Sequence, residues 1–169
     1  MRPALILLLI ASSPLFAGCG DGRPGLVKVS GTVQLDGKPM AGAMVSFQPV
    51  VDSKSDFKRP SAAVTDSSGK FVLGTYQKDD GVPQGKYKVG IQKRDLIGDL
   101  PPNYNEETPG AYTLKYKWTI PRKYSDPASS GLEAEVTSSE LKPATIDLQS
   151  GGEKPEIEVS GQRRRANDP

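Results

Sequence analysis

The chain contains no histidine, and Cys19 is its only cysteine. Without histidine, neither a Ser-His-Asp triad nor a Cys-His catalytic pair can be built, and zinc sites made from histidine and cysteine are excluded as well. Basic and acidic residues nearly balance, at 22 and 20, so no strong positive field would attract nucleic acid. Carboxylate and Ser-Lys chemistry remain open. We expect a protein that is not an enzyme, holds no metal and no cofactor, and has no nucleic acid among its partners.

The first eighteen residues have the pattern of a secretory signal peptide. Arg2 precedes the apolar run "ALILLLIA", and small and turn-forming residues follow it up to Cys19. The run is shorter than the ~20 apolar residues that a transmembrane helix needs. A membrane anchor helix is an alternative, which Pro14 and Gly18 disfavour because both residue types break helices.

The segment "LFAGCG", residues 15–20, resembles the lipobox of bacterial lipoproteins, in which a bulky residue and two small ones precede an obligatory cysteine. The resemblance implies that Cys19 is lipidated on its thiol and becomes the new N-terminus, so that acyl chains hold the protein on a membrane of the cell envelope. In the sorting rule of some bacteria, an acidic residue after this cysteine retains the protein at the inner membrane. Gly20 therefore favours the outer membrane. A secreted protein with an incidental cysteine is the alternative.

After a tether at residues 19–25, the sequence is typical of one all-β domain over residues 26–150. The 15 prolines and 18 glycines of the full chain indicate many turns. Apolar and polar residues alternate with period two in short segments, as in half-buried strands. These segments are 26–35, 43–49, 61–65, 70–76, 86–93, 114–120, 132–136 and 144–148. Turn signals at intervals of about 8–12 residues favour an antiparallel sandwich or barrel.

The connecting segments carry three further expectations. Asp36-Gly37 is a strong hairpin signal, so we expect segment 43–49 to return as the second strand. Residues 94–113 contain three prolines and form a long connection of the kind that often carries function. The polar tail, residues 151–169, is expected to be mostly disordered, with an edge strand at "EIEV", residues 156–159, as the alternative.

Several motifs in order resemble the carboxypeptidase regulatory-like, transthyretin-like domain. They are "VSGTVQLDGKPMAGAMVSFQP" (29–49), "VTDSSGKFVL" (64–73), "GVPQGKYKVGI" (81–91) and "IPRKYSDPASSGLEAEV" (120–136). The resemblance implies a single antiparallel Greek-key β-sandwich of about seven strands, of the transthyretin-like (prealbumin-like) kind. Domains of this family usually act as accessory or binding modules. An enzymatic relative with this fold relies on histidines, which this chain lacks.

Half of the aromatic residues that follow residue 18 lie between residues 104 and 124. They are Tyr104, Tyr112, Tyr116, Trp118 and Tyr124. Flat rings with a polar group suit the faces of sugars or a protein partner. The alternative is that Tyr116, Trp118 and Tyr124 cover the core or close one end of the sandwich.

Other candidate sites have simpler explanations. Ser55 and Ser67 each stand three residues before a lysine, as in penicillin-binding enzymes, but both lie in predicted loops or turns. A β-turn is enough to explain the calcium-loop-like sequence at Asp66. Arg163, Arg164 and Arg165 could touch anionic polymers, or simply form a solvated tail.

Together these patterns predict a lipid-anchored protein of the cell envelope with a non-catalytic binding or structural module. The first hypothesis is protein–protein interaction through a sheet edge or through residues 94–124, because exposed edge strands accept further strands. The second is binding of carbohydrate or cell-wall polymer through the aromatic-rich residues 104–124. A row of solvent-exposed aromatic rings would favour carbohydrate as the ligand, whereas an exposed apolar strand edge would favour a protein.

Overall fold

The computed structural model describes residues 23–51, 57–105, 107 and 112–160. This part of the chain is all-β, with fourteen strands, one short 3-10 helix and no α-helix. The elements are β1 (Leu26–Val27), β2 (Ser30–Leu35), β3 (Lys38–Pro39), β4 (Met44–Pro49), β5 (Ser61–Val64), β6 (Lys70–Val72), β7 (Val82–Pro83), β8 (Gly85–Gln92), β9 (Arg94–Leu96), β10 (Leu114–Trp118), η2 (Arg122–Tyr124), β11 (Leu132–Val136), β12 (Leu141–Lys142), β13 (Thr145–Leu148) and β14 (Ile157–Ser160).

Two larger sheets enclose one hydrophobic core. The five-stranded sheet has the order β12-β11-β8-β4-β5, and the four-stranded sheet has the order β13-β2-β3, with β6 also paired to β2. On β8, Tyr87, Val89 and Ile91 are buried between the sheets while Lys86 and Lys88 are exposed, as the alternation predicts. All buried residues of the core cluster lie between Val29 and Leu148. A chain that begins at Gly20 therefore contains the whole core.

The strand pairing is antiparallel with one exception. β13 runs parallel to β2, with Thr145 opposite Thr32 and Leu148 opposite Leu35. The expectation of antiparallel pairing throughout is wrong at this pair. The two strands are far apart in sequence, so no hairpin turn sets their relative direction.

The predicted hairpin turn forms, but its partner strand differs from the expected one. Asp36 and Gly37 have φ of 51° and 74°, which are left-handed values that two-residue hairpin turns require. The turn joins β2 to the two-residue β3, with Leu35 opposite Lys38. Segment 43–49 does not pair with β2: it forms β4 in the other sheet, between β5 and β8. The segment that passes from β3 to β4 in the other sheet is fixed by the Thr65 hydroxyl, which donates to the Met40 carbonyl and accepts from the Ala43 N–H.

Two segments expected to lack regular structure contain strands. The start of the 94–113 connection forms β9, and residues 157–160 of the tail form β14. Both pair with β10 and give a third sheet of order β14-β10-β9. Disorder was therefore the wrong expectation for residues 157–160, and the edge-strand alternative holds. The predicted signal peptide, Cys19 and Arg163–Arg165 lie outside the described residues.

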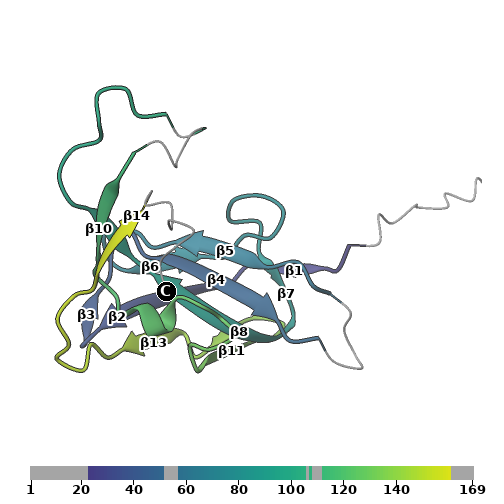
Figure 1. Cartoon of the computed structure of the whole chain (residues 1–169). Helices are drawn as coiled ribbons and strands as arrows, with labels where there is room; N and C mark the ends of the chain where they lie inside the picture. The colour runs from purple at the N-terminus through teal and green to yellow at the C-terminus, as the bar shows by residue number, and fades with distance from the viewer. Residues whose placement is uncertain (1–22, 52–56, 106, 108–111, 161–169) are drawn as a thin grey trace, which may run out of the picture.

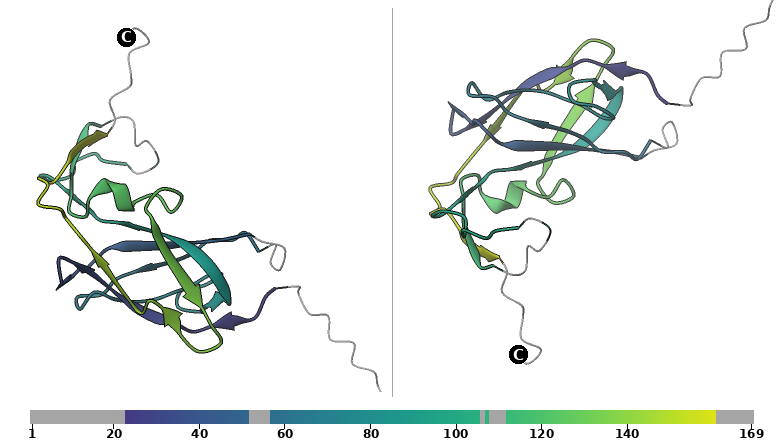
Figure 2. Two further views of the ribbon diagram at one scale, coloured as in Figure 1. Left: turned by 90° about the horizontal axis from the view of Figure 1, so that it is seen from below. Right: turned by 90° about the horizontal axis from the view of Figure 1, so that it is seen from above.

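The third sheet lies at one end of the molecule, and the N-terminal end of the described chain lies at the other. Figures 1 and 2 show β10 and β14 projecting beyond the two larger sheets, on the side opposite β1. β1 is held at its own end by antiparallel pairing with β7, where Leu26 lies opposite Pro83. The chain thus enters the fold at one end and leaves it from the other.

Gly31 of β2 leaves room for the ring of Phe71, its cross-strand neighbour on β6 of the same sheet. A Cβ atom at this residue would lie 2.5 Å and 2.8 Å from two ring atoms of Phe71 and 3.0 Å from the Ala144 carbonyl oxygen. The Phe71 ring is buried and packs in the core cluster, so it has little room to move.

We therefore expect Gly31→Ala to lower the free energy of unfolding by about 1–3 kcal/mol, the usual cost of overpacking. Gly25→Ala is the control, since a Cβ there meets no atom within 4 Å. Urea unfolding of both variants measures the difference. Equal midpoints for the two variants would show that the Gly31–Phe71 contact is not tight.

Candidate functional site

The third sheet places the predicted aromatic strand between two short strands. In β10, Leu114 and Trp118 are buried, Tyr116 is half-buried, and Lys115 and Lys117 are exposed. The register sets Tyr116 opposite Glu158 of β14 and opposite Leu96 of β9. Because side chains alternate between the two faces of a sheet, all of these even-numbered residues share one face. We call this the inner face.

On the inner face, Glu158 connects all three strands. Its Oε2 accepts a hydrogen bond of 2.8 Å from the indole N–H of Trp118, and its Oε1 lies 3.1 Å from an Arg94 guanidinium nitrogen. The Arg94 guanidinium in turn lies 4.5 Å from the centre of the Tyr116 ring. One carboxylate thus fixes an indole on β10 and a guanidinium on β9 to β14. A charge-assisted contact of this kind is among the stronger polar interactions in proteins.

A second ion pair supports the entry to β14. Arg122 of η2 lies 3.0 Å from Oε1 of Glu156, and its guanidinium lies 5.6 Å from the centre of the Trp118 ring. The backbone N–H of Trp118 donates to the Glu156 carbonyl at 2.9 Å. Trp118 is only 6% exposed, so its ring supports the third sheet and offers no open platform.

The other predicted aromatic residues lie elsewhere. Tyr104 and Tyr112 form a pair with ring centres 5.8 Å apart and ring planes tilted by 51°. The Tyr112 hydroxyl donates to the Asn103 carbonyl, and the Tyr104 N–H donates to the Pro101 carbonyl. Tyr124 packs against the core, and its hydroxyl donates to the Gln149 carbonyl at 3.2 Å. The five predicted residues therefore occupy three places and do not form one row of exposed rings.

Two exposed apolar side chains lie on the edge strand β14, on the outer face of the third sheet, where the aromatic pattern gave no signal. Ile157 and Val159 of β14 are 51% and 42% exposed. They lie opposite Lys117 and Lys115 in the register. The order β14-β10-β9 leaves β14 at the edge, and no strand of the described chain pairs with its other side.

Within the described residues, the backbone groups on the outer side of β14 have no strand partner. Since Trp118 donates to Glu156, residues 158 and 160 occupy the other hydrogen-bonded positions of an antiparallel ladder. The N–H and C=O groups of Ile157 and Val159 then point away from β10. An edge with β-branched side chains and free backbone groups is a template for a further strand.

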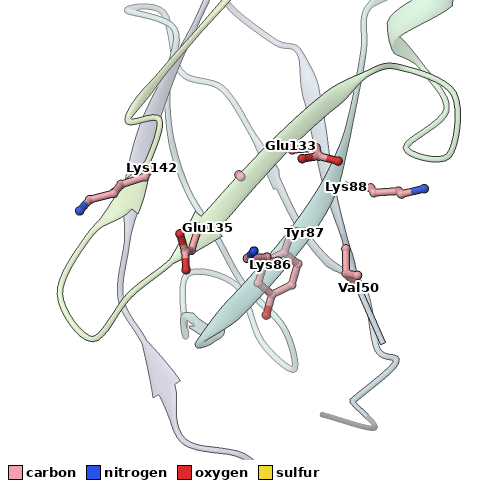
Figure 3. A pocket seen from close by; sticks show the side chains of 8 residues that line it. Val50, Lys86, Tyr87, Lys88, Glu133, Glu135 and Lys142 are labelled. Atoms are coloured by element: carbon pink, nitrogen blue, oxygen red, sulfur yellow. The ribbon is translucent and has the colours of Figure 1, made fainter. Parts of the chain in front are cut away.

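A hollow of about 470 Å³ lies on the exposed face of the five-stranded sheet and is lined mainly by charged side chains (Figure 3). In it, Glu133 lies opposite Lys88 and Glu135 lies opposite Lys86, as cross-strand neighbours of opposite charge that stabilise the sheet, and Lys142 adds a further positive charge. Burial raises the pKa of Tyr87, which also lines the hollow, to about 12, and its hydroxyl donates to the Pro83 carbonyl. Tyr87 is therefore neutral and hydrogen-bonded at physiological pH.

The described ranges contain no group of three acidic or cysteine side chains that could hold a metal ion. Within the same ranges, no helix has the length and apolar character needed to cross a bilayer. No protein-family model, curated protein or solved structure matches the chain.

We expect Glu158→Ala to release β14 from the third sheet, because the indole N–H of Trp118 and the Arg94 guanidinium both lose their acceptor. The free energy of unfolding should fall by about 1–3 kcal/mol, and Trp118 emission should shift to longer wavelength as water reaches the ring. Glu153→Ala, at an exposed residue of the turn before β14, is the control and should change neither quantity. Unchanged emission in Glu158→Ala would contradict the role assigned to this carboxylate.

Proposed function

We propose that this protein is a lipid-anchored protein of the cell envelope that binds an extended segment of a partner protein at the edge of β14. The observation that carries the proposal is the arrangement of the two ends. The proposed lipid site, Cys19, precedes Arg23 and β1 at one end, whereas the open edge of β14 lies at the other end (Figure 1). An anchored domain of this shape presents β14 away from the membrane. Gly20 favours the outer membrane as the site of anchoring.

We further propose that the domain is a transthyretin-like Greek-key sandwich of the carboxypeptidase regulatory-like family. Two sheets around one core support this assignment, as does the formation of β2, β4 and β8 within the motifs that carry the resemblance. β9, β10 and β14 are then an addition at one end of the sandwich. The edge of that addition is where this chain binds its partner, and the role is non-catalytic.

The side chains and backbone of β14 fit a protein strand as the ligand. Ile157 and Val159 offer two apolar side chains on one face and up to four backbone groups that face away from β10 along one edge. A partner strand with apolar residues at alternate positions would cover both. Carboxylates on the partner would find Lys115 and Lys117 on the same face. Carbohydrate is the less favoured ligand, because Trp118 is buried and the Tyr104 and Tyr112 rings are tilted and half-buried.

The anchoring part of the proposal predicts lipid on Cys19. Cells expressing the full chain and grown with a palmitate analogue should label the wild type, and Cys19→Ala should lose the label because no other thiol is present. Equal incorporation by both proteins would contradict the lipid anchor. That outcome would leave the edge of β14 as a site in a secreted protein.

The binding part predicts that Val159→Pro abolishes partner binding without unfolding the domain. Proline removes the outward N–H of residue 159, and edge strands tolerate it because this N–H takes no part in the β10–β14 ladder. Val159→Thr is the matched control, since it keeps both the N–H and the branched side chain. A photo-crosslinking residue at position 157 in whole cells measures contact with the partner.

We expect one discrete adduct with the wild type and with Val159→Thr, and its loss in Val159→Pro while Trp118 emission is unchanged. An adduct that persists in Val159→Pro would contradict binding through the edge. An adduct with the mass of two copies of this chain would contradict a foreign partner and would show that the edge of β14 binds a second copy of the chain.

A further inference from the structure

A hollow of about 250 Å³ lies beside the start of β14. Its wall includes Glu156, which directly precedes β14, and Trp118, the last residue of β10. Leu35 at the end of β2 lines it as well. The hollow therefore lies where the third sheet meets the four-stranded sheet, at one end of the open edge.

The hollow opens on the inner face of the third sheet. The backbone N–H of Trp118 donates to the Glu156 carbonyl, so the ladder between β10 and β14 continues through this pair. Because Ile157 is on the outer face, Glu156 shares the inner face with Glu158. A strand that pairs with the open side of β14 would set one residue opposite Glu156, on the same face and about 4.5–5.5 Å away. The side chain of that residue would lie next to the hollow.

The charged side chains of the wall cancel one another. Arg122 and Lys154 are its basic residues, and Glu153 and Glu156 are its acidic residues. Arg122 and Glu156 form the ion pair of 3.0 Å described above, and Glu153 and Lys154 are exposed neighbours in the chain. A charged occupant would lose water and find no excess of opposite charge, so the wall favours a neutral one.

Apart from these groups, the wall is mainly apolar. Its apolar residues are Leu35, Trp118, Pro121 and Pro155, and its neutral polar residues are Thr119 and Ser150. In the part of the chain that the structure describes, every buried side-chain nitrogen and oxygen has a hydrogen-bond partner. The hollow therefore needs no polar ligand atom, and an occupant would gain mainly by covering apolar surface.

The volume of the hollow suits a single side chain. Pockets for small-molecule ligands usually have about 300–1,000 Å³, and this hollow of about 250 Å³ is smaller. Where a peptide adds a strand to a sheet, backbone hydrogen bonds give affinity, and pockets for side chains at alternate positions give specificity. The edge of β14 and the adjoining hollow fit these two parts.

We propose that the hollow receives one large apolar side chain of the partner segment that pairs with β14. This inference rests on the binding function proposed above and names the chemistry of the partner. The partner is an extended segment whose residue opposite Glu156 is a large aliphatic or aromatic one. The hollow also fixes the register of the added strand, because a slip by one residue would turn this side chain to the outer face.

The hollow itself is tested with a probe that carries one apolar side chain. The chain from Gly20 without lipid, which retains the whole core, is titrated with N-acetyl-phenylalaninamide, and the emission of its only tryptophan, Trp118, is recorded. We expect a saturable shift to shorter wavelength, because the ring displaces water from the wall that contains Trp118. N-acetyl-alaninamide should give no shift. The same response to both probes, or no response to either, would overturn the inference.

Pro155→Asp places a charge in the apolar wall. We expect it to weaken binding of the phenylalanine probe about 4- to 15-fold, which is the effect of losing one or two buried methylene contacts. Pro60→Asp is the matched control, because Pro60 is an exposed proline that does not line the hollow, and it should bind as the wild type does. Trp118 emission without probe checks the fold of both variants. Equal weakening in the two would count against the hollow as the site.

Cross-linking in whole cells tests whether the hollow belongs to the partner site. A photo-crosslinking residue at position 153, which lines the hollow, should give the same adduct as one at position 157. Position 28, which is exposed and follows β1, is the control and should give no adduct. An adduct at 157 without one at 153 would overturn this inference and leave the proposed function intact. No adduct at either position would overturn both.

Discussion

The functional arrangement depends on one carboxylate, that of Glu158. Its two oxygens bind the Trp118 indole and the Arg94 guanidinium, which lie on two other chain segments. Without this contact, β14 would be held on β10 only by a four-residue ladder and by the Arg122–Glu156 ion pair at its entry. With it, β14 becomes a fixed strand whose far side is open. The buried Trp118 thus supports the proposed binding edge and exposes little surface of its own.

The proposed anchor and the proposed binding edge lie at opposite ends of the molecule. The proposed lipid site precedes the point where the chain enters the fold, and β14 lies where the described chain ends (Figures 1 and 2). Between them, the core holds the two sheets together and carries no group that the proposals use. In an anchored protein such a rigid core would keep the edge of β14 apart from the membrane.

The sequence predicts the strands that are long enough to show alternation, and it fails where strands are short or where pairing is distant. β8 and β10 have five or more residues and lie where period two predicts them. β3 and β9 have two and three residues, too few for a periodic signal. The candidate site was predicted only in part. Aromatic content drew attention to Trp118, but its partner Glu158 is 40 residues away, and only the register of β14 brings the two together.

Amide hydrogen exchange along β14 reports both how firmly this strand is held on β10 and whether its other side is open. The account predicts alternation: slow exchange at Glu158 and Ser160, whose N–H groups face β10, and fast exchange at Ile157 and Val159, whose N–H groups face outwards. Fast exchange at all four residues would contradict a fixed strand. Slow exchange at all four would show that the edge is already covered in the free protein and is not available to a partner.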